Sequence, residues 1–477
     1  MLGSGFFIRM SPNPIISNQS KLLCTINTIV RFCIICLTLI YSTQNNATNI
    51  SQTEAKADID SFVNALKEIH PDLFFSCKEQ TFNENLANIH NQLTCSYYNP
   101  IELYRILQPL TILLGDGHTQ LYFPKNVLIE ENPSVFPLLI EINTNDSTFW
   151  LKEDFKSKNV TLKKGTQILS INGNNYSSLV KEMLPYCGGE RLFFRFSKVN
   201  RDFVHFLYML HPSNSFTVCY RFENKQKECN LKAIPYQKYV EKTTKQTSSQ
   251  EAYQFNIIDN KTALMTFNAF TDLGKFKSFA DSMFSQLQKQ QIKHLIIDLR
   301  MNGGGDSNIG DELFQYISDR PFVQFEQFIT RYSSLQKKLA KENFGTDYFN
   351  HENGIDSVTN LPLIPLRPNP FRFKEKITLL ISHTTFSSAS AFAWAFQKMN
   401  RGTIIGEESG GMSICFGDVV IYQLPHSNIA STISFARVFL YKAKENDIHG
   451  VLPDIEIPQE QALDFVLKNS KGTTIRN

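Results

Sequence analysis

The sequence is 477 residues long, 42% hydrophobic and 19% charged, with a formal net charge of +3. This length allows two or three domains, and the composition is that of a globular protein rather than of a disordered chain. The small net charge and the lack of a long basic run give no support for nucleic-acid binding. The cysteines and histidines show no paired ligand spacing, so the sequence predicts neither a metal site nor a cofactor.

The first 48 residues differ from the rest of the chain. Lys21 and Arg31 precede a short apolar run at residues 32–41, and a polar stretch follows. The run is shorter than the roughly 20 residues of a transmembrane helix, and its flanks suit the apolar core of a secretory signal. We therefore expect residues 1–48 to be a signal peptide or a membrane anchor, and the protein to be periplasmic, extracellular or attached to the cell surface. A buried helix is the alternative.

Residues 49–130 are predicted to form a helical N-terminal unit. Apolar residues recur at three- and four-residue steps in the segments 59–69, 82–93 and 101–114, which predicts three helices. Pro71 ends the first of them, because the residue before a proline avoids the helical region. The third leads into the turn Asp116-Gly117-His118-Thr119.

Residues 131–245 are predicted to be rich in strands. Segment 164–173 resembles the central strand and turn of a PDZ domain, and a short helix is expected after it. A PDZ domain binds an extended peptide by adding it to the edge of a sheet. Capture of a peptide substrate and a purely structural role are both open here.

Two disulfides are compatible with the cysteine positions if the chain is exported. Cys219 and Cys229 are symmetric about Asn224 in a predicted hairpin, and Cys77 and Cys95 form a second candidate pair. An oxidising compartment would permit both, although the connectivity does not follow from the sequence.

Strands and helices alternate in residues 246–477, which predicts an α/β domain. The apolar strand at 295–299 runs into Gly303-Gly304-Gly305. Such a loop can present backbone N–H groups to an anion. No Gly-Lys-Ser/Thr follows, so it is not a nucleotide-binding loop. An oxyanion hole and a plain turn remain as interpretations.

Ser387 lies between a predicted strand at 377–381 and a predicted helix that begins near Ala389. Free N–H groups and the positive end of the helix would surround a hydroxyl placed there. They would stabilise the oxyanion that a nucleophilic serine creates. An ordinary serine N-cap is the alternative.

Four segments together resemble the tail-specific (C-terminal processing) and tricorn-core family of serine peptidases. In chain order they are Asp298–Gly304, Thr385–Ser390, Gly406–Gly411 and Gly450–Ile455. The resemblance implies a crotonase-like (ClpP/crotonase) catalytic domain over 246–477, with the PDZ-like domain inserted before it. It also implies that Ser387 is the nucleophile and that Gly303, Gly304 and Ser388 form the oxyanion hole.

The family contains a Ser–Lys and a Ser–His branch, and the sequence favours the second. Gly411 stands where the first branch has its lysine, and Lys398 would lie about 16 Å from Ser387 along a helix. The tricorn-like branch takes its base from an Asp-Gly-His-Thr turn, which implies His118 here. Histidine suits this role because its ordinary pKa is about 6.5. His449 is a weaker candidate.

An acidic group should orient the histidine, and the resemblance implies either Glu445 or Asp447. The spacing to the last motif favours Asp447, whereas the residue type favours Glu445. Two positions depart from the family pattern. Gly117 replaces a serine beside the histidine, and Ser390 replaces a glutamate in the nucleophile motif.

The sequence thus predicts a serine endopeptidase that cleaves unfolded or tail segments of proteins. A non-catalytic peptide- or ligand-binding protein on the same scaffold is the alternative, since the retinoid-binding interphotoreceptor protein resembles these peptidases and works as a carrier. An acyl-CoA enzyme is a more distant alternative, because the crotonase fold also hosts those.

Overall fold

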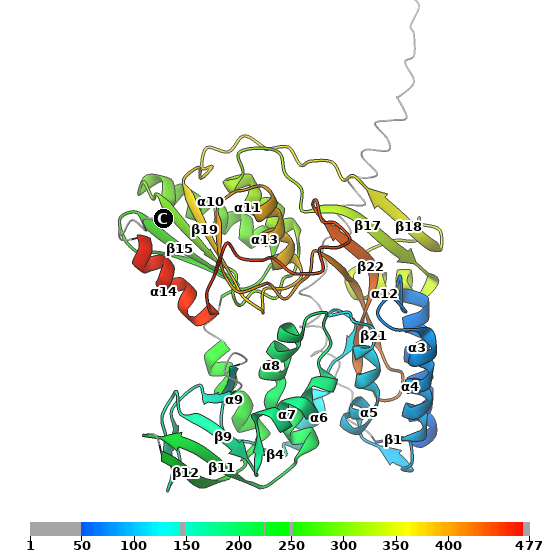
Figure 1. Ribbon diagram of the computed structural model, residues 1–477. Helices are drawn as coiled ribbons and strands as arrows, with labels where there is room; N and C mark the ends of the chain where they lie inside the picture. The colour runs from blue at the N-terminus through cyan, green and yellow to red at the C-terminus, as the bar shows by residue number, and fades with distance from the viewer. Residues whose placement is uncertain (1–48, 144–147, 224, 248–250, 471–477) are drawn as a thin grey trace, which may run out of the picture.

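The computed structural model describes residues 49–143, 148–223, 225–247 and 251–470. Figure 1 shows three parts: helices α3 to α5 on one side, a sheet with its helices below, and a larger α/β part that carries the C-terminus. The predicted signal or anchor, residues 1–48, lies outside the described residues. Within these ranges no helix is both long and apolar enough to cross a lipid bilayer.

The N-terminal part is helical where the apolar spacing predicts it. Its helices are α3 (Gln52–Ile69), α4 (Glu79–Asn91) and α5 (Pro100–Ile112). A capping box starts α3, because Ser51 accepts from the N–H of Glu54 and the Glu54 carboxylate accepts in return. Short strands β1 (Ile50–Ser51) and β2 (Tyr97–Tyr98) pair beside these helices.

The middle part contains a six-stranded sheet in which β12, β11, β9, β6 and β5 lie in that order, with β10 paired to β9. All of these pairs are antiparallel. The strands are β5 (Ile140–Asn143), β6 (Thr148–Leu151), β9 (Gln167–Ile171), β10 (Asn174–Asn175), β11 (Ser215–Phe222) and β12 (Lys225–Lys232). The helices are α6 (Lys125–Glu131), α7 (Tyr176–Met183), α8 (Leu192–Leu210) and α9 (Tyr236–Thr247).

The β11–β12 register explains why the expected cross-strand disulfide does not form. Cys229 faces Val218, and Cys219 faces Glu228, so the two cysteines are one position out of register. A shift of one residue places two side chains on opposite faces of a sheet. Both thiols are free, as are those of Cys77 and Cys95. The two proposed pairings are therefore wrong for this structure.

The C-terminal part contains two sheets. The first is mostly parallel and contains β14 (Tyr253–Ile257), β15 (Thr262–Phe267), β16 (His294–Asp298), β19 (Lys376–Ile381), β20 (Thr403–Gly406) and β23 (Ile455–Glu456), in that order. Its helices are α10 (Leu273–Lys289), α11 (Asn308–Ile317), α13 (Ser388–Lys398) and α14 (Gln459–Ser470). Strand β16 is buried on both faces, which explains its unbroken apolar run.

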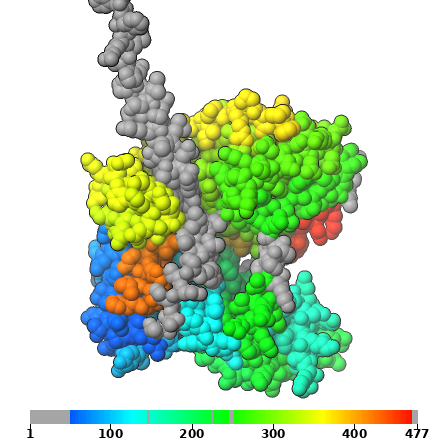
Figure 2. Space-filling view, turned by 180° about the vertical axis from the view of Figure 1, so that it is seen from behind, coloured from blue at the N-terminus to red at the C-terminus, as the bar shows by residue number. Residues whose placement is uncertain are grey.

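The second sheet is antiparallel and links this part to the N-terminal helices. It contains β18 (Gly354–Thr359), β17 (Phe325–Tyr332), β22 (Ala430–Leu440) and β21 (Ile414–Gln423), with α12 (Ser334–Phe344) beside it. Strand β3 (Gln120–Leu121), just after the His118 turn, pairs with β22. In Figure 2 the N-terminal helices, in blue, pack directly against the β21–β22 hairpin, in orange. Buried apolar residues from Ile50 to Val451 form one hydrophobic core, which includes side chains of both the N-terminal helices and this hairpin.

Candidate active site

Ser387 occupies a strained position between β19 and α13. Its backbone has φ 53° and ψ −129°, and its side chain caps no N–H of the helix. An ordinary serine N-cap has extended backbone angles and a capping hydrogen bond. A positive φ at a non-glycine residue costs energy and is concentrated at functional sites. The geometry therefore differs from the simple capping alternative.

His118 reaches Ser387 from the turn that follows α5. Its Nε2 lies 3.1 Å from the Ser387 Oγ, although 269 residues separate the two in sequence. The imidazole packs against the ring of Phe386, with centroids 4.5 Å apart. The turn is fixed to β22, because the Thr432 hydroxyl donates to the His118 carbonyl at 2.6 Å. This is the arrangement of a nucleophile and its general base.

Asp116 is the carboxylate nearest to His118 among the contacts of the described residues. Its Oδ1 accepts from the His118 backbone N–H at 2.8 Å and lies 3.9 Å from the His118 Nδ1. The Ser434 hydroxyl donates to Oδ2 at 2.7 Å, and the His70 Nε2 lies 3.4 Å from the same oxygen. These contacts hold the Asp-Gly-His turn in one conformation.

The electrostatics favour a neutral imidazole beside an ionised carboxylate. Burial lowers the pKa of His118, against the opposing charge of Asp116. Burial alone would raise the pKa of Asp116, but the hydrogen bond and charge of His70, followed by the charge of His118, lower it overall. A neutral histidine can accept the serine proton, and the carboxylate then stabilises the imidazolium.

The glycine loop packs against the nucleophile. Gly304 has φ +98°, and a Cβ on it would lie 2.8 Å from the Phe386 carbonyl and 2.9 Å from the Ser388 nitrogen. Only glycine fits so close to the backbone. However, the Gly304 N–H donates to the Asn302 side chain at 2.9 Å, so it is already engaged. The N–H groups of Gly303 and of Ser388, the latter in the first turn of α13, would be better placed to donate to an oxyanion.

Most of the C-terminal part is similar to a known protein family. The model of peptidase family S41 matches residues 261–457. Residues 261–457 belong to peptidase family S41. The chain is also 26% identical over 197 residues to the chloroplastic C-terminal processing peptidase of Tetradesmus obliquus, across 41% of this chain and 34% of that one. It thus spans about a third of that relative.

Solved structures share the fold over a greater length. Mature CPAF aligns with 89% of this chain and 99% of its own, with a TM-score of 0.64 and 15% identity. Mature CPAF complexed with lactacystin gives a TM-score of 0.61 at 15% identity. At such low identity the likeness is one of fold. A fold of mixed α and β content is therefore shared with mature CPAF across the N-terminal helices as well as the matched region.

The structure does not bring Glu445 or Asp447 to His118. Glu445 is exposed to solvent. The Asp447 carboxylate accepts from the Lys444 N–H at 2.7 Å and lies 4.0 Å from the His449 Nε2. Local hydrogen bonding within its own loop therefore occupies Asp447. The carboxylate that lies beside the imidazole is that of Asp116, two positions before His118 in the same turn and 3.9 Å from the His118 Nδ1.

Glu190 and Lys198 lie beside the His118 turn, and no signal in the sequence pointed to either. A side chain on Gly117, where the family has serine, would meet the Glu190 Oε2 at 2.8 Å. Burial, with the charge of Asp116, raises the pKa of Glu190, whereas burial lowers that of Lys198. Lys198 donates to the Gly117 carbonyl at 3.0 Å. Glu190 thus fills the space that the missing serine leaves.

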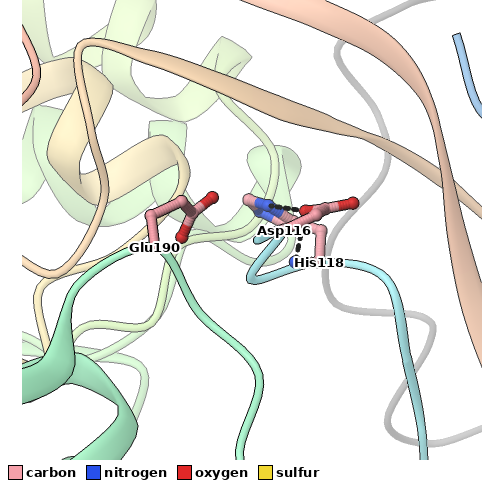
Figure 3. A group of neighbouring side chains, drawn as sticks. All are labelled: Asp116, His118 and Glu190. Carbon is pink, nitrogen blue, oxygen red and sulfur yellow. Dashed lines mark hydrogen bonds and ion pairs between the residues drawn. The ribbon is translucent and has the colours of Figure 1, made fainter. Parts of the chain in front are cut away.

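Figure 3 shows Asp116, His118 and Glu190 converging from two separate segments. Their ligand atoms lie within 4.8 Å of one another, so these three residues could together hold a cation. Both oxygens of Asp116 already accept hydrogen bonds from His118 and Ser434. The arrangement therefore has the contacts of a histidine-positioning cluster rather than of a site made for a metal.

Ser390 ties the nucleophile turn to the neighbouring loop. Its hydroxyl donates to the Thr385 carbonyl at 2.8 Å and accepts from the Gly411 N–H at 3.2 Å. Gly411 stands where the Ser–Lys branch has its lysine. A serine here, in place of the usual glutamate, therefore keeps the turn and the loop in contact through two short hydrogen bonds.

Proposed function

We propose that this chain is a serine endopeptidase with a Ser387–His118 mechanism. The observation that carries the proposal is the 3.1 Å contact between the His118 Nε2 and the Ser387 Oγ on a strained strand–helix turn. Membership of residues 261–457 in a peptidase family supports it. The expected substrates are unfolded proteins and exposed tail segments, a class to which the name of the chloroplast relative also points.

In the proposed mechanism, His118 takes the Ser387 proton as the oxygen attacks a peptide carbonyl. The N–H groups of Gly303 and Ser388 stabilise the oxyanion, and Asp116 stabilises the imidazolium. His118 then protonates the leaving amine. Water next attacks the acyl-enzyme with His118 again as base, and Ser387 is regenerated.

The remaining parts receive roles in the same proposal. Residues 246–477 would be the crotonase-like catalytic domain, and residues 131–245 a PDZ-like domain that presents extended peptides. Residues 49–130 would deliver the histidine. The leader at residues 1–48 would export the protein, cleaved as a signal or kept as an anchor. Cell fractionation of the full chain with and without residues 1–48 tests this export.

The decisive experiment compares the full chain with its Ser387→Ala and His118→Ala variants on a denatured, fluorescently quenched protein. We expect each substitution to lower kcat by about 10⁴- to 10⁶-fold, because members of a catalytic unit act together. His426→Ala is the matched control, since the side chain of that histidine is 39% exposed and lies 3.9 Å from the Glu54 carboxylate of α3. Labelling of Ser387 by a fluorophosphonate reports the nucleophile independently of the substrate.

Two outcomes would contradict the proposal. Undiminished cleavage by a folded Ser387→Ala variant would remove the nucleophile assignment. A folded parent that neither cuts denatured proteins nor takes the label would favour the alternative, a non-catalytic binding protein on the same scaffold.

A further inference from the structure

A pocket opens directly beside Ser387 and His118. Its water-accessible volume is about 50 Å³, and both of these residues line it together with Ser388. Its walls are otherwise largely apolar and include Phe328 and Leu440. A substrate carbonyl held at Ser387 would therefore place one neighbouring side chain in this pocket. The pocket is the natural place for substrate selection.

Asp418 gives this apolar pocket a single acidic group. Among the described residues that line the pocket it is the one carboxylate, and neither a lysine nor an arginine accompanies it. Its Oδ2 is buried and has no hydrogen-bond partner. Burial raises the pKa of Asp418 to about 8. Leaving such a group unpaired in an apolar setting costs free energy, so its presence needs an explanation.

The backbone at Asp418 is also unusual. Asp418 lies within β21, yet its φ is +46°. Left-handed backbone inside a strand is strained for a residue with a side chain, although aspartate tolerates it better than most. Burial alone raises the pKa of Asp418, so no cation among the described residues lies close enough to oppose it. Tyr332 and Tyr348 lie close enough for the Asp418 charge, after burial, to raise their pKa values.

We infer that Asp418 makes this pocket select a substrate side chain that carries a positive charge, lysine or arginine, next to the bond that is cut. A lysine or arginine has an apolar stem that matches the pocket walls and a cationic end that pairs with the carboxylate. An apolar side chain would pack against the walls but leave the carboxyl group unpaired. An acidic one would bring a second carboxyl group into an apolar site and no cation to pair with the first.

This inference rests on the proposed peptidase function, and the test separates the two. The full chain is given matched quenched peptides that differ only at the residue before the cleaved bond: lysine, arginine, leucine, phenylalanine or glutamate. We expect kcat/KM to be about 10- to 100-fold higher for lysine and arginine, the range that one charge-assisted hydrogen bond provides. Ser387→Ala should abolish all cleavage.

Asp418→Asn is the matched variant, because asparagine keeps the shape and tolerates a positive φ. It should remove the preference for lysine and arginine while leucine is cut at least as fast as by the parent. Asp319→Asn, at an exposed aspartate, should change nothing. Because the variant could misfold, selectivity is also measured on the parent alone, by inhibition with peptide aldehydes. A peptide aldehyde ending in lysine should inhibit at least ten times more strongly than one ending in leucine.

The outcomes are distinct. Serine-dependent cleavage after leucine or phenylalanine, at rates equal to those after lysine, would overturn the selectivity and leave the peptidase function intact. A preference that survives in Asp418→Asn would overturn the role of this carboxylate. Absence of any cleavage by the folded parent would overturn both the function and the inference.

Discussion

At the scale of single residues, the site is defined by how closely the backbone of one segment approaches another. Gly304 touches the turn that holds Ser387, whereas a Cβ on Gly303 would meet nothing within 4 Å. A side chain therefore has no room at Gly304 but has room at Gly303, and the sequence does not reveal this difference. The difference allows the oxyanion loop to be tested with one substitution at each position.

We expect Gly304→Ala to impair both stability and catalysis. Its positive φ and the contacts at 2.8 Å and 2.9 Å force the loop or the Ser387 turn to move. The free energy of unfolding should fall by about 1–3 kcal/mol, and kcat/KM by about 10²- to 10³-fold. Gly303→Ala keeps its N–H and should change neither quantity appreciably. Equal activity of both variants would show that the loop does not support the oxyanion.

The pKa of His118 leads to a prediction of pH dependence. The base must be neutral, and burial lowers its pKa, so activity should persist below the ordinary histidine value of about 6.5. Asp116 opposes this shift, so Asp116→Asn should move the acid limb of kcat/KM to still lower pH while reducing kcat. Asp319→Asn, at an exposed aspartate, is the control, and it should leave that limb in place. An acid limb above pH 6.5 in the parent would contradict the prediction.

The sequence predicted Ser387 and His118 because each lies in a short motif whose chemistry depends on local geometry. It could not select the acid. Spacing to the last motif favoured Asp447 and residue type favoured Glu445, but Asp447 contacts Lys444 and His449 of its own loop. Glu190 lies 72 positions from His118 and belongs to the segment before α8, so only the packing of two parts brings it to Gly117.

At the scale of elements, one buried carboxylate joins the first helix to the last hairpin. Asp58 of α3 accepts from the backbone N–H groups of His426 at 2.9 Å and Ser427 at 2.8 Å. These donors lie in the turn between β21 and β22. Strand β22 also holds the His118 turn. The helix therefore supports the catalytic histidine through the hairpin.

Asp58→Ala should lower the free energy of unfolding by about 1–3 kcal/mol, because it leaves two N–H groups without their partner. The effect is measured by urea denaturation. Asp60→Ala is the matched control on the same helix, since the Asp60 side chain is 52% exposed and pairs with His90 at the surface. That change should cost less than about 1 kcal/mol. Equal losses would mean that the link to the hairpin adds nothing.

Elements with strong local patterns were predicted well. Helices α3 to α5 and strands β9, β11, β16 and β19 lie where apolar spacing and β-type runs placed them. Pairing was less predictable, because the hairpin between β11 and β12 differs by one residue from a symmetric turn. Helix α8 was not predicted at all. Its aromatic residues pack on both the middle sheet and the active site, so its sequence lacks a clear polar face.

At the scale of the whole molecule, the site exists because three parts of the chain meet. The N-terminal part supplies His118, the middle part supplies Glu190 and Lys198, and the C-terminal part supplies Ser387. A continuous hydrophobic core joins the first and last of these parts. Non-covalent contacts should therefore hold the site together even when the chain is cut.

This expectation can be tested by placing a specific protease site at residues 248–250 of the full chain. After the cut, the two pieces should elute together in size-exclusion chromatography, and kcat/KM should stay within about twofold, because the buried apolar area that joins them is unchanged. The uncut protein with the same insertion is the control. Separation of the pieces with loss of activity would show that the covalent link is required.

The distance in sequence between His118 and Ser387 has a further consequence during synthesis. A ribosome completes the histidine turn 269 residues before it reaches the serine, and the hairpin that holds this turn is made later still. A nascent chain that ends before Thr432 contains the base without this support. A protein with the proposed activity would thus leave the ribosome unable to cut its neighbours, and it would gain that ability only when the last strands have folded onto the first helices.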